Sequence, residues 1–238
     1  MTNPVKAALV LGGLIAIGLM GLGVIAGNSA LEVKGLERTV TVKGLAEREV
    51  PADLAVWPIR FAEAGNDLSQ VYAALERNSM RIVQFLTEQG FPAAEISVAA
   101  PTVNDKLAQQ YGGNGAVGLR YAASQAVTVR SSNIDLVRAS VRRIAELGKT
   151  GIVFSGSEYQ GQTEYLFTGL NALKPQMIEE ATRSAREVAD KFAKDSASQL
   201  GKIRSANQGQ FSVENLDSST PHVKKVRVVS TVEYYLSD

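Results

Sequence analysis

The sequence contains no cysteine and one histidine, His222, among its 238 residues. The lack of cysteine excludes a thiolate nucleophile, a disulfide framework, an iron–sulfur cluster and any cysteine-ligated zinc site. A single histidine also excludes metal sites built on paired histidines. The net charge is also small, at +1, because 25 Lys and Arg nearly cancel 24 Asp and Glu. We therefore expect no metal, no cofactor and no nucleic-acid partner, for which a broad basic surface would supply the affinity.

The N-terminal region is a long run without charge. Residues 7–27 contain no charged side chain, and the uncharged stretch continues to Leu31. At about 1.5 Å per residue, a helix of this length crosses a hydrocarbon core of about 30 Å. A cleaved signal peptide is the alternative, but its apolar region is usually only about 7 to 15 residues long, and a cut after Ala30 would put Asn28 where a small residue is preferred. The sequence therefore predicts a transmembrane anchor over residues 7–30.

The flanking charges predict the orientation of this anchor. Lys6 precedes it, so the positive-inside tendency puts residues 1–6 in the cytoplasm, although Lys34 and Arg38 on the far side weaken the bias. Residues 31–38 then form a polar tether, and residues 39–238 form a single domain outside. Gly23 and Gly27 make a GxxxG pair, which can let two membrane helices approach closely.

Apolar spacing after the tether predicts alternating strands and helices. Pro58 indicates an edge or a bulge in its strand, because proline cannot donate to a ladder. Capping residues at Asn66 and Asp67, and a capping box of Ser132 with Asp135, predict where the first two helices of the domain begin. The predicted strands are Thr39–Lys43, Ala52–Ala62, Glu95–Val103, Leu119–Arg130, Gly151–Tyr159, Ile203–Val213 and Lys225–Leu236. The predicted helices end at Gly90 and Gly148, and a third, Ala-rich helix runs from about Pro175 to Gly201.

This order of elements predicts an α+β fold with an antiparallel or mixed sheet. Strand, helix, strand occurs twice, over 52–103 and 119–159, and right-handed crossovers would put both helices on one face of a common sheet. With the long Ala-rich helix, about three helices cover the sheet. On that helix, Glu179 with Arg183, Glu187 with Lys191 and Asp190 with Lys194 are spaced for a solvated, ion-paired face.

Two segments resemble the SIMPL-domain family of the bacterial cell envelope. They are VTVKGLAEREVPADLAVW, residues 40–57, where the family has a strand with a small Gly-containing turn, and EEATRSAREVADKFAKDSASQLGKI, residues 179–203, an Ala-rich helix closed by Leu-Gly before a strand. The resemblance implies a periplasmic or envelope-associated protein that forms large homo-oligomers and is linked to tolerance of oxidative stress. It transfers no catalytic motif. Because many members look secreted with a cleavable signal, the long anchor here is a departure from the family pattern.

Several motifs carry possible chemistry, and none predicts a catalytic, cofactor-binding or metal-binding residue. Gly113, Gly115 and Gly118 match the letters of the dinucleotide fingerprint G-x-G-x-x-G, but a strand follows them where a helix is required. Ser155 lacks the glycine two residues earlier that a nucleophile elbow needs. His222 lies in a polar loop, which is typical of an exposed histidine.

Carboxylates form two further groups, Glu47, Glu49 and Asp53 in one, and Glu158 and Glu164 near another strand end in the other. They could do acid–base work or bind calcium only if they converge in space. The tyrosines at 111, 121, 159, 165, 234 and 235 are typical of core packing or a subunit interface.

Three functions remain open at the level of sequence. The leading hypothesis is a non-enzymatic, inner-membrane protein with a periplasmic domain that self-associates into a ring or cage, aided by tethering to the membrane, with loop Gln109–Gly118 as a candidate partner contact. The alternative is an accessory or chaperone-like subunit that binds another envelope protein by strand addition, with 52–62 as the candidate edge. A metal-independent hydrolase using Ser and Lys is the third.

Overall fold

The computed structural model describes residues 4–35, 38–108, 118–155 and 162–237. The chain divides into two compact units, where the sequence predicted one domain over residues 39–238. Unit 1 comprises Met1–Glu47, Leu173–Ser212 and Arg227–Asp238, and unit 2 comprises Arg48–Ala172 and Val213–Val226. The α+β class predicted from the sequence is confirmed.

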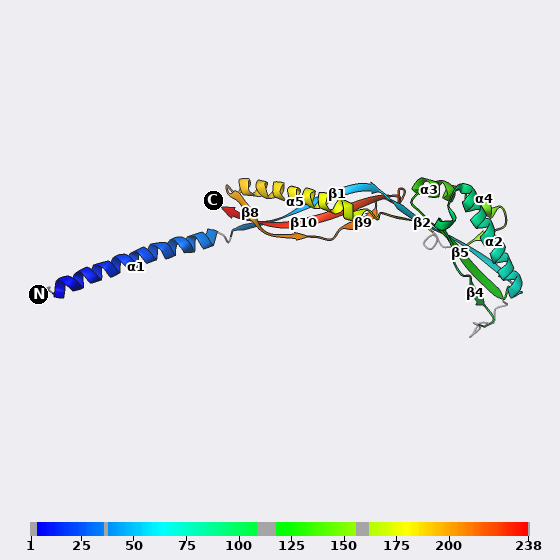
Figure 1. Cartoon of the computed structure of the whole chain (residues 1–238), viewed down its shortest axis with the longest axis horizontal. Helices are drawn as coiled ribbons and strands as arrows, with labels where there is room; N and C mark the ends of the chain where they lie inside the picture. Colours follow the sequence, from blue (N-terminus) through cyan, green and yellow to red (C-terminus); the bar gives the residue numbers. More distant parts are fainter. Residues whose placement is uncertain (1–3, 36–37, 109–117, 156–161, 238) are drawn as a thin grey trace. The chain divides into compact units, whose positions relative to one another are not determined.

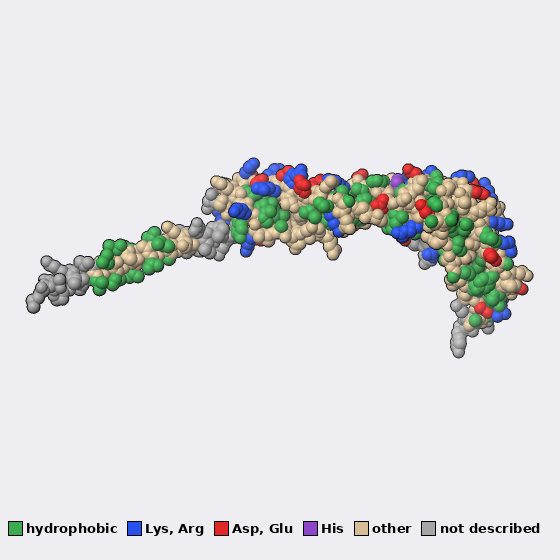
Figure 2. All heavy atoms as spheres, viewed as in Figure 1, with side chains coloured by type: hydrophobic (Ala, Val, Ile, Leu, Met, Phe, Trp, Pro, Cys, Tyr) green, Lys and Arg blue, Asp and Glu red, His purple; other side chains and the backbone are tan. Residues whose placement is uncertain are grey.

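Helix α1 runs from Pro4 to Gly35. Its segment Leu11–Ser29 has a mean hydropathy of 1.8 and is, among the described residues, the one stretch of helix long and apolar enough to cross a membrane. Figure 2 shows hydrophobic side chains along the visible face of this segment. A signal sequence at the same place would have the same character. Residues 31–35, predicted as part of a tether, continue the helix.

One sheet joins the early and late parts of the chain. Its main order is β1-β10-β8, formed by β1 (Thr39–Pro51), β10 (Val223–Ser237) and β8 (Gln199–Gln208), and β9 (Ser212–Asn215) also pairs with β10. Helix α5 (Leu170–Asp195) lies along this sheet in unit 1 (Figure 1). Alanines at every fourth position, Ala181, Ala185 and Ala189, are fully buried, so the helix packs closely on the strands.

Gly44 is the contact point of β1 with α5. A Cβ atom there would lie 1.9 Å from the Ala181 carbonyl oxygen and 2.4 Å from the Ala185 backbone nitrogen. The family pattern led us to expect a small turn at this glycine, and that expectation is wrong, because β1 continues to Pro51. The glycine serves close approach of a helix, not a turn.

The ends of α5 also differ from the prediction. The helix begins five residues before Pro175, which lies inside it. It ends at Asp195, and Gly201 belongs to β8. Ala197 adopts a positive φ of 52°, while Ser198 N–H donates to Ala193 C=O at 2.8 Å and Ala197 N–H to Lys194 C=O at 3.1 Å. This is a Schellman ending with alanine in the position that usually holds glycine, which is why the sequence pattern pointed to Gly201 instead. Of the three predicted ion pairs on α5, the one found among the described residues is Arg183–Glu179, at 3.1 Å.

Unit 2 is built on the second sheet, of order β3-β5-β2-β6. Its long strands β2 (Leu54–Gly65) and β5 (Tyr121–Ser131) pair antiparallel along their whole length. The short strands are β3 (Ile96–Val98) and β4 (Thr102–Asp105), both on β5, and β6 (Val153–Phe154) and β7 (Glu164–Leu166), both on β2. Helix α2 (Leu68–Gln89) follows β2, and α3 (Ile134–Arg143) and α4 (Ala145–Gly148) follow β5; a short 3-10 turn, η1, covers Ala93–Glu95.

The two predicted β-α-β units are present and interleaved. β2 and β3 both run antiparallel to β5, so they are parallel to each other, with β5 between them. In the same way, β5 and β6 both run antiparallel to β2, so they are parallel to each other, with β2 between them. This is the split β-α-β arrangement. α2 and α3 contribute Leu75, Leu86 and Val137 to one buried cluster with alternate residues of β2 and β5 such as Phe61 and Val127. Both helices therefore cover the same face of the common sheet.

Several helix and strand boundaries in unit 2 differ from those predicted from the sequence. The strand predicted over 95–103 is broken into β3 and β4 at Pro101, which cannot donate to a ladder. The cap of α3 is Asn133, whose side chain accepts from Leu136 N–H at 3.0 Å, and not Ser132. β6 has only two residues of the strand predicted over 151–159, of which 156–159 lie outside the described residues.

The prediction that residues 52–62 form a sheet edge is wrong, because β2 lies inside the sheet. Pro58 is tolerated there for a local reason. The Arg60 carbonyl accepts from Ser155 N–H on the β6 side, so the alternate residue Pro58 also turns its nitrogen away from β5. No described strand pairs with residues 57–60 on that side.

Candidate functional site

Where the structure describes them, the residues predicted as candidates for chemistry do not converge on one site. Gly113 and Gly115 lie outside the described residues, as does most of loop 109–118, and β5 follows Gly118 closely. His222 packs edge-on against Tyr165, with ring centroids 6.1 Å apart, and its carbonyl accepts from Ala52 N–H at 2.8 Å. These contacts give His222 a packing role. Burial raises the pKa of Tyr165.

Two of the candidate carboxylates, Asp53 and Glu47, make structural contacts in different parts of the chain. Asp53 accepts hydrogen bonds from the backbone N–H groups of Thr168 at 2.8 Å and Gly169 at 3.0 Å, which fixes the two residues before α5. Glu47 lies 3.6 Å from Arg227. Within the part of the chain that the structure describes, no three His, Asp or Glu side chains are grouped to hold a metal ion. Glu158 lies outside that part.

Tyr121 and Tyr234 likewise pack against hydrophobic clusters. Tyr234 is 1% exposed in the core of unit 1, and burial raises its pKa. Tyr121 lies beneath the Arg120 guanidinium at 4.8 Å, and the same arginine pairs with Asp105 at 2.8 Å. Tyr111 and Tyr159 lie outside the described residues.

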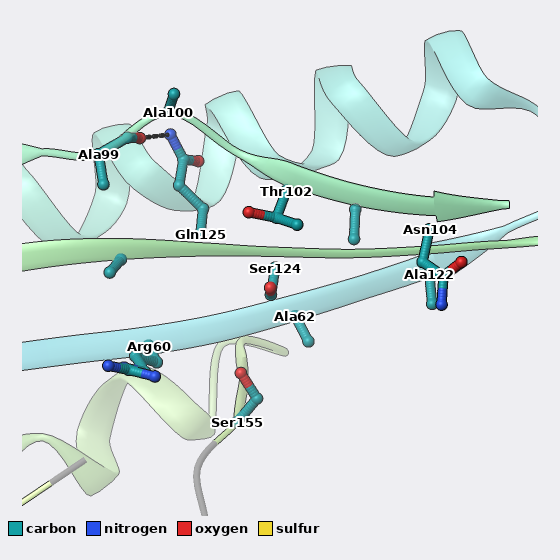
Figure 3. Close-up of a pocket in the computed structure, with 12 residues that line it drawn as sticks. Arg60, Ala62, Ala99, Ala100, Thr102, Asn104, Ala122, Ser124, Gln125 and Ser155 are labelled. Carbon is teal, nitrogen blue, oxygen red and sulfur yellow. Dashed lines mark hydrogen bonds between the residues drawn. The ribbon is translucent and has the colours of Figure 1, made fainter. Parts of the chain in front are cut away.

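A shallow pocket of about 660 Å³ lies on the sheet of unit 2 (Figure 3). Small side chains from β2, β4 and β5 line most of it, among them Ala62, Thr102 and Ser124. Gln125 donates from Nε2 to Ala99 C=O at 2.8 Å, while its buried Oε1 accepts nothing from the described residues. Among the described residues that line the pocket, no carboxylate, histidine or lysine accompanies the hydroxyl groups of Thr102, Ser124 and Ser155.

A second, polar groove of about 1100 Å³ in unit 2 is lined by β2, β7 and residues 215–224. Lys224, in its wall, is 8% exposed. Lys224 was not among the predicted site residues, although the sequence carries a signal for it. Lys224 is in phase with Val226, Val228 and Val232, the buried residues that alternate along β10. A lysine on the buried face of a strand is unusual, because its ammonium group must then be hydrogen-bonded or paired with an opposite charge.

The sheet of unit 1 leaves an edge strand open. β8 pairs with β10 on one side and with no described strand on the other. Residues 202–208 are all exposed, so the strand is uncovered on its faces as well as its edge. Gly209 N–H donates to Val229 C=O, so the alternate residues Asn207 and Ser205 bond inward to β10. Ala206 and Gln208 therefore direct their backbone N–H and C=O groups outward.

These features define an α+β protein with an N-terminal helix able to cross a membrane and an uncovered sheet edge. Residues 40–234 match the model of a family described as SIMPL, protein of unknown function (DUF541). The chain therefore belongs to the SIMPL family, as its two resembling segments predicted. No curated protein matches it.

Proposed function

We propose that this SIMPL protein is an inner-membrane, cell-envelope protein without enzymatic activity whose periplasmic part assembles into a homo-oligomeric ring or cage. The observation that carries the proposal is the edge of β8, with which no described strand pairs. Unpaired backbone groups on an exposed edge are a template for another strand. The proposal includes α1 as an uncleaved anchor and a contribution to oxidative or envelope stress tolerance, as the family resemblance implies.

The sheet suggests how copies would join. β1 forms its other edge, and exposed Thr41, Lys43 and Leu45 alternate along that strand. Pairing of β8 in one copy with β1 in the next is a head-to-tail contact, and such contacts build rings when the rotation closes. Tethering by α1 raises the effective concentration of weakly pairing domains.

Cysteine cross-linking tests this arrangement cleanly because the chain has no cysteine of its own. Asn207→Cys on β8 is combined in turn with Thr41→Cys, Lys43→Cys or Leu45→Cys on β1, in intact membranes under mild oxidation. We expect a ladder of multimers from at least one pair and no ladder from any single variant. Glu187→Cys, on the exposed side of α5, is the control. A ladder absent from every pair, or dimers from Asn207→Cys alone, would overturn head-to-tail pairing.

A second candidate function uses the same edge differently. An accessory subunit would accept a strand from another envelope protein on β8. In that case one foreign protein would co-purify with the chain in a fixed ratio, Ala206→Pro would release it, and the paired β8 and β1 cysteines would give no ladder.

A further inference from the structure

Lys224 is a buried cation with no carboxylate partner among the described residues. Its ammonium group donates to the Asn215 side-chain oxygen, a neutral acceptor. No described carboxylate lies within 4 Å of it. Burying a charge without an opposite charge is costly, and burial here lowers the pKa of Lys224. Since an ammonium has three N–H donors and Asn215 takes one, donor capacity remains for a group that enters the groove.

The rest of the groove wall has the same bias. Arg60 projects from β2, is exposed, and makes no ion pair with a described carboxylate. Glu164 is the one carboxylate among the described lining residues, and it pairs with neither cation. Hydroxyl groups of Thr163 and Ser218 also line the wall. The described part of the groove wall therefore offers two cations and neutral donors against a single negative charge.

We propose that this groove binds a small oxyanion-bearing ligand, whose carboxylate or phosphate group accepts from Lys224 Nζ and faces Arg60. Neutral hydroxyl and amide groups of the wall hydrogen-bond the remainder of the ligand. Such a site explains why a lysine occupies a buried position of β10 with no described carboxylate beside it. It goes beyond the proposed function, because binding here requires no contact between copies.

The test is isothermal titration of the full-length chain in a neutral detergent at low ionic strength. Glutarate and inorganic phosphate serve as separate probes, which distinguishes a carboxylate from a phosphate ligand, and sodium chloride is the control titrant. We expect saturable binding of glutarate or phosphate and none of chloride at equal concentration.

Variants locate the binding. Asn215→Asp supplies Lys224 with a carboxylate of nearly the same shape, so it should weaken binding at least about tenfold while keeping the fold. Arg60→Gln, at an exposed position, should weaken it severalfold. Lys225→Met, one residue along β10, removes the same charge on the other face and should leave affinity unchanged. Unchanged affinity in Asn215→Asp, equal loss in Lys225→Met, or no binding of either anion up to about 10 mM would overturn the proposal.

Discussion

Gly44 shows at the scale of one residue how this fold depends on the absence of a side chain. Its Cα faces the backbone of α5 so closely that a methyl group would overlap the Ala181 carbonyl oxygen. Backbone atoms of a packed helix cannot move aside as a flexible side chain can, so the strain must separate β1 from α5.

Gly44→Ala should therefore destabilise the protein by about 3 kcal/mol, at the upper end of the cost of overpacking. Urea unfolding followed by circular dichroism measures the change. Gly148→Ala is the matched control, since a Cβ there meets only Phe154 at 3.9 Å. Equal stability of the two variants would show that α5 does not rest on Gly44 in solution.

Ala197 is a position where a substitution should stabilise the protein. Its φ of 52° is a left-handed conformation that costs an L-residue about 1 kcal/mol and costs glycine almost nothing. We expect Ala197→Gly to raise the free energy of unfolding by about 0.5 to 1 kcal/mol, measured by the same urea titration. Ser196→Gly, just before the Schellman position, should not stabilise. A stability loss in Ala197→Gly would contradict the Schellman ending.

Hydrogen-bonded carboxylates determine how the stability of the protein should change in acid. Hydrogen bonds from Ser219 and Thr220 hold the pKa of Asp217 well below its usual range, and the Arg120 hydrogen bond lowers that of Asp105. Because their folded pKa values lie below the unfolded ones, the stability they contribute is present above about pH 4 and is lost as the pH falls below it. Asp217→Asn should flatten this loss in thermal melts between pH 5 and 3, values that bracket the usual carboxyl pKa of about 4. Glu187→Gln should leave it as steep as in the wild type; equal slopes for both variants would refute the assignment.

At the level of a single strand, one substitution on β8 should leave the fold intact and prevent assembly. The N–H of Ala206 points away from β10, so Ala206→Pro removes an outward donor without breaking an inward ladder bond. In the Asn207→Cys background with its β1 partner, we expect Ala206→Pro to abolish the multimer ladder and shift the melting temperature by less than about 3 °C. Ala206→Val should keep the ladder. Persistence of the ladder with proline present would place the contact elsewhere.

The elements also show what the sequence could predict. Strong local signals held: Asp67 caps α2, with its carboxylate accepting from Ser69 and Gln70 N–H, and Gly90 ends it with a φ of 102°. The β-strand alternation of residues 119–130 correctly predicted β5. Errors arose where long-range contacts decide. Pro58 reads as an edge residue, yet it lies inside the sheet because its side of β2 is unpaired between two short strands.

The candidate sites were harder to predict for the same reason. Asp53 contacts Thr168, 115 residues later in the chain, so its structural role has no local signature. Lys224 had one, its phase on the buried face of β10, but its partner Asn215 and the groove around it depend on tertiary structure.

At the scale of the whole molecule, the proposed assembly combines two weak contacts. If α1 is a membrane anchor, its glycines, including Gly23 and Gly27, would let two helices approach closely, and the edge of β8 that no described strand covers would pair with a second copy. Neither contact would need to be strong, because tethering would make the second contact effectively intramolecular. Assembly should then depend on the folded part as well as on the anchor.

The most direct measurement is the molar mass of the full-length chain in a mild detergent, by light scattering with correction for bound detergent, over a wide range of protein concentration. We expect one discrete oligomer well above the 25.4 kDa chain, which Ala206→Pro converts to smaller species. A monodisperse monomer at the highest concentration would overturn the proposed self-assembly.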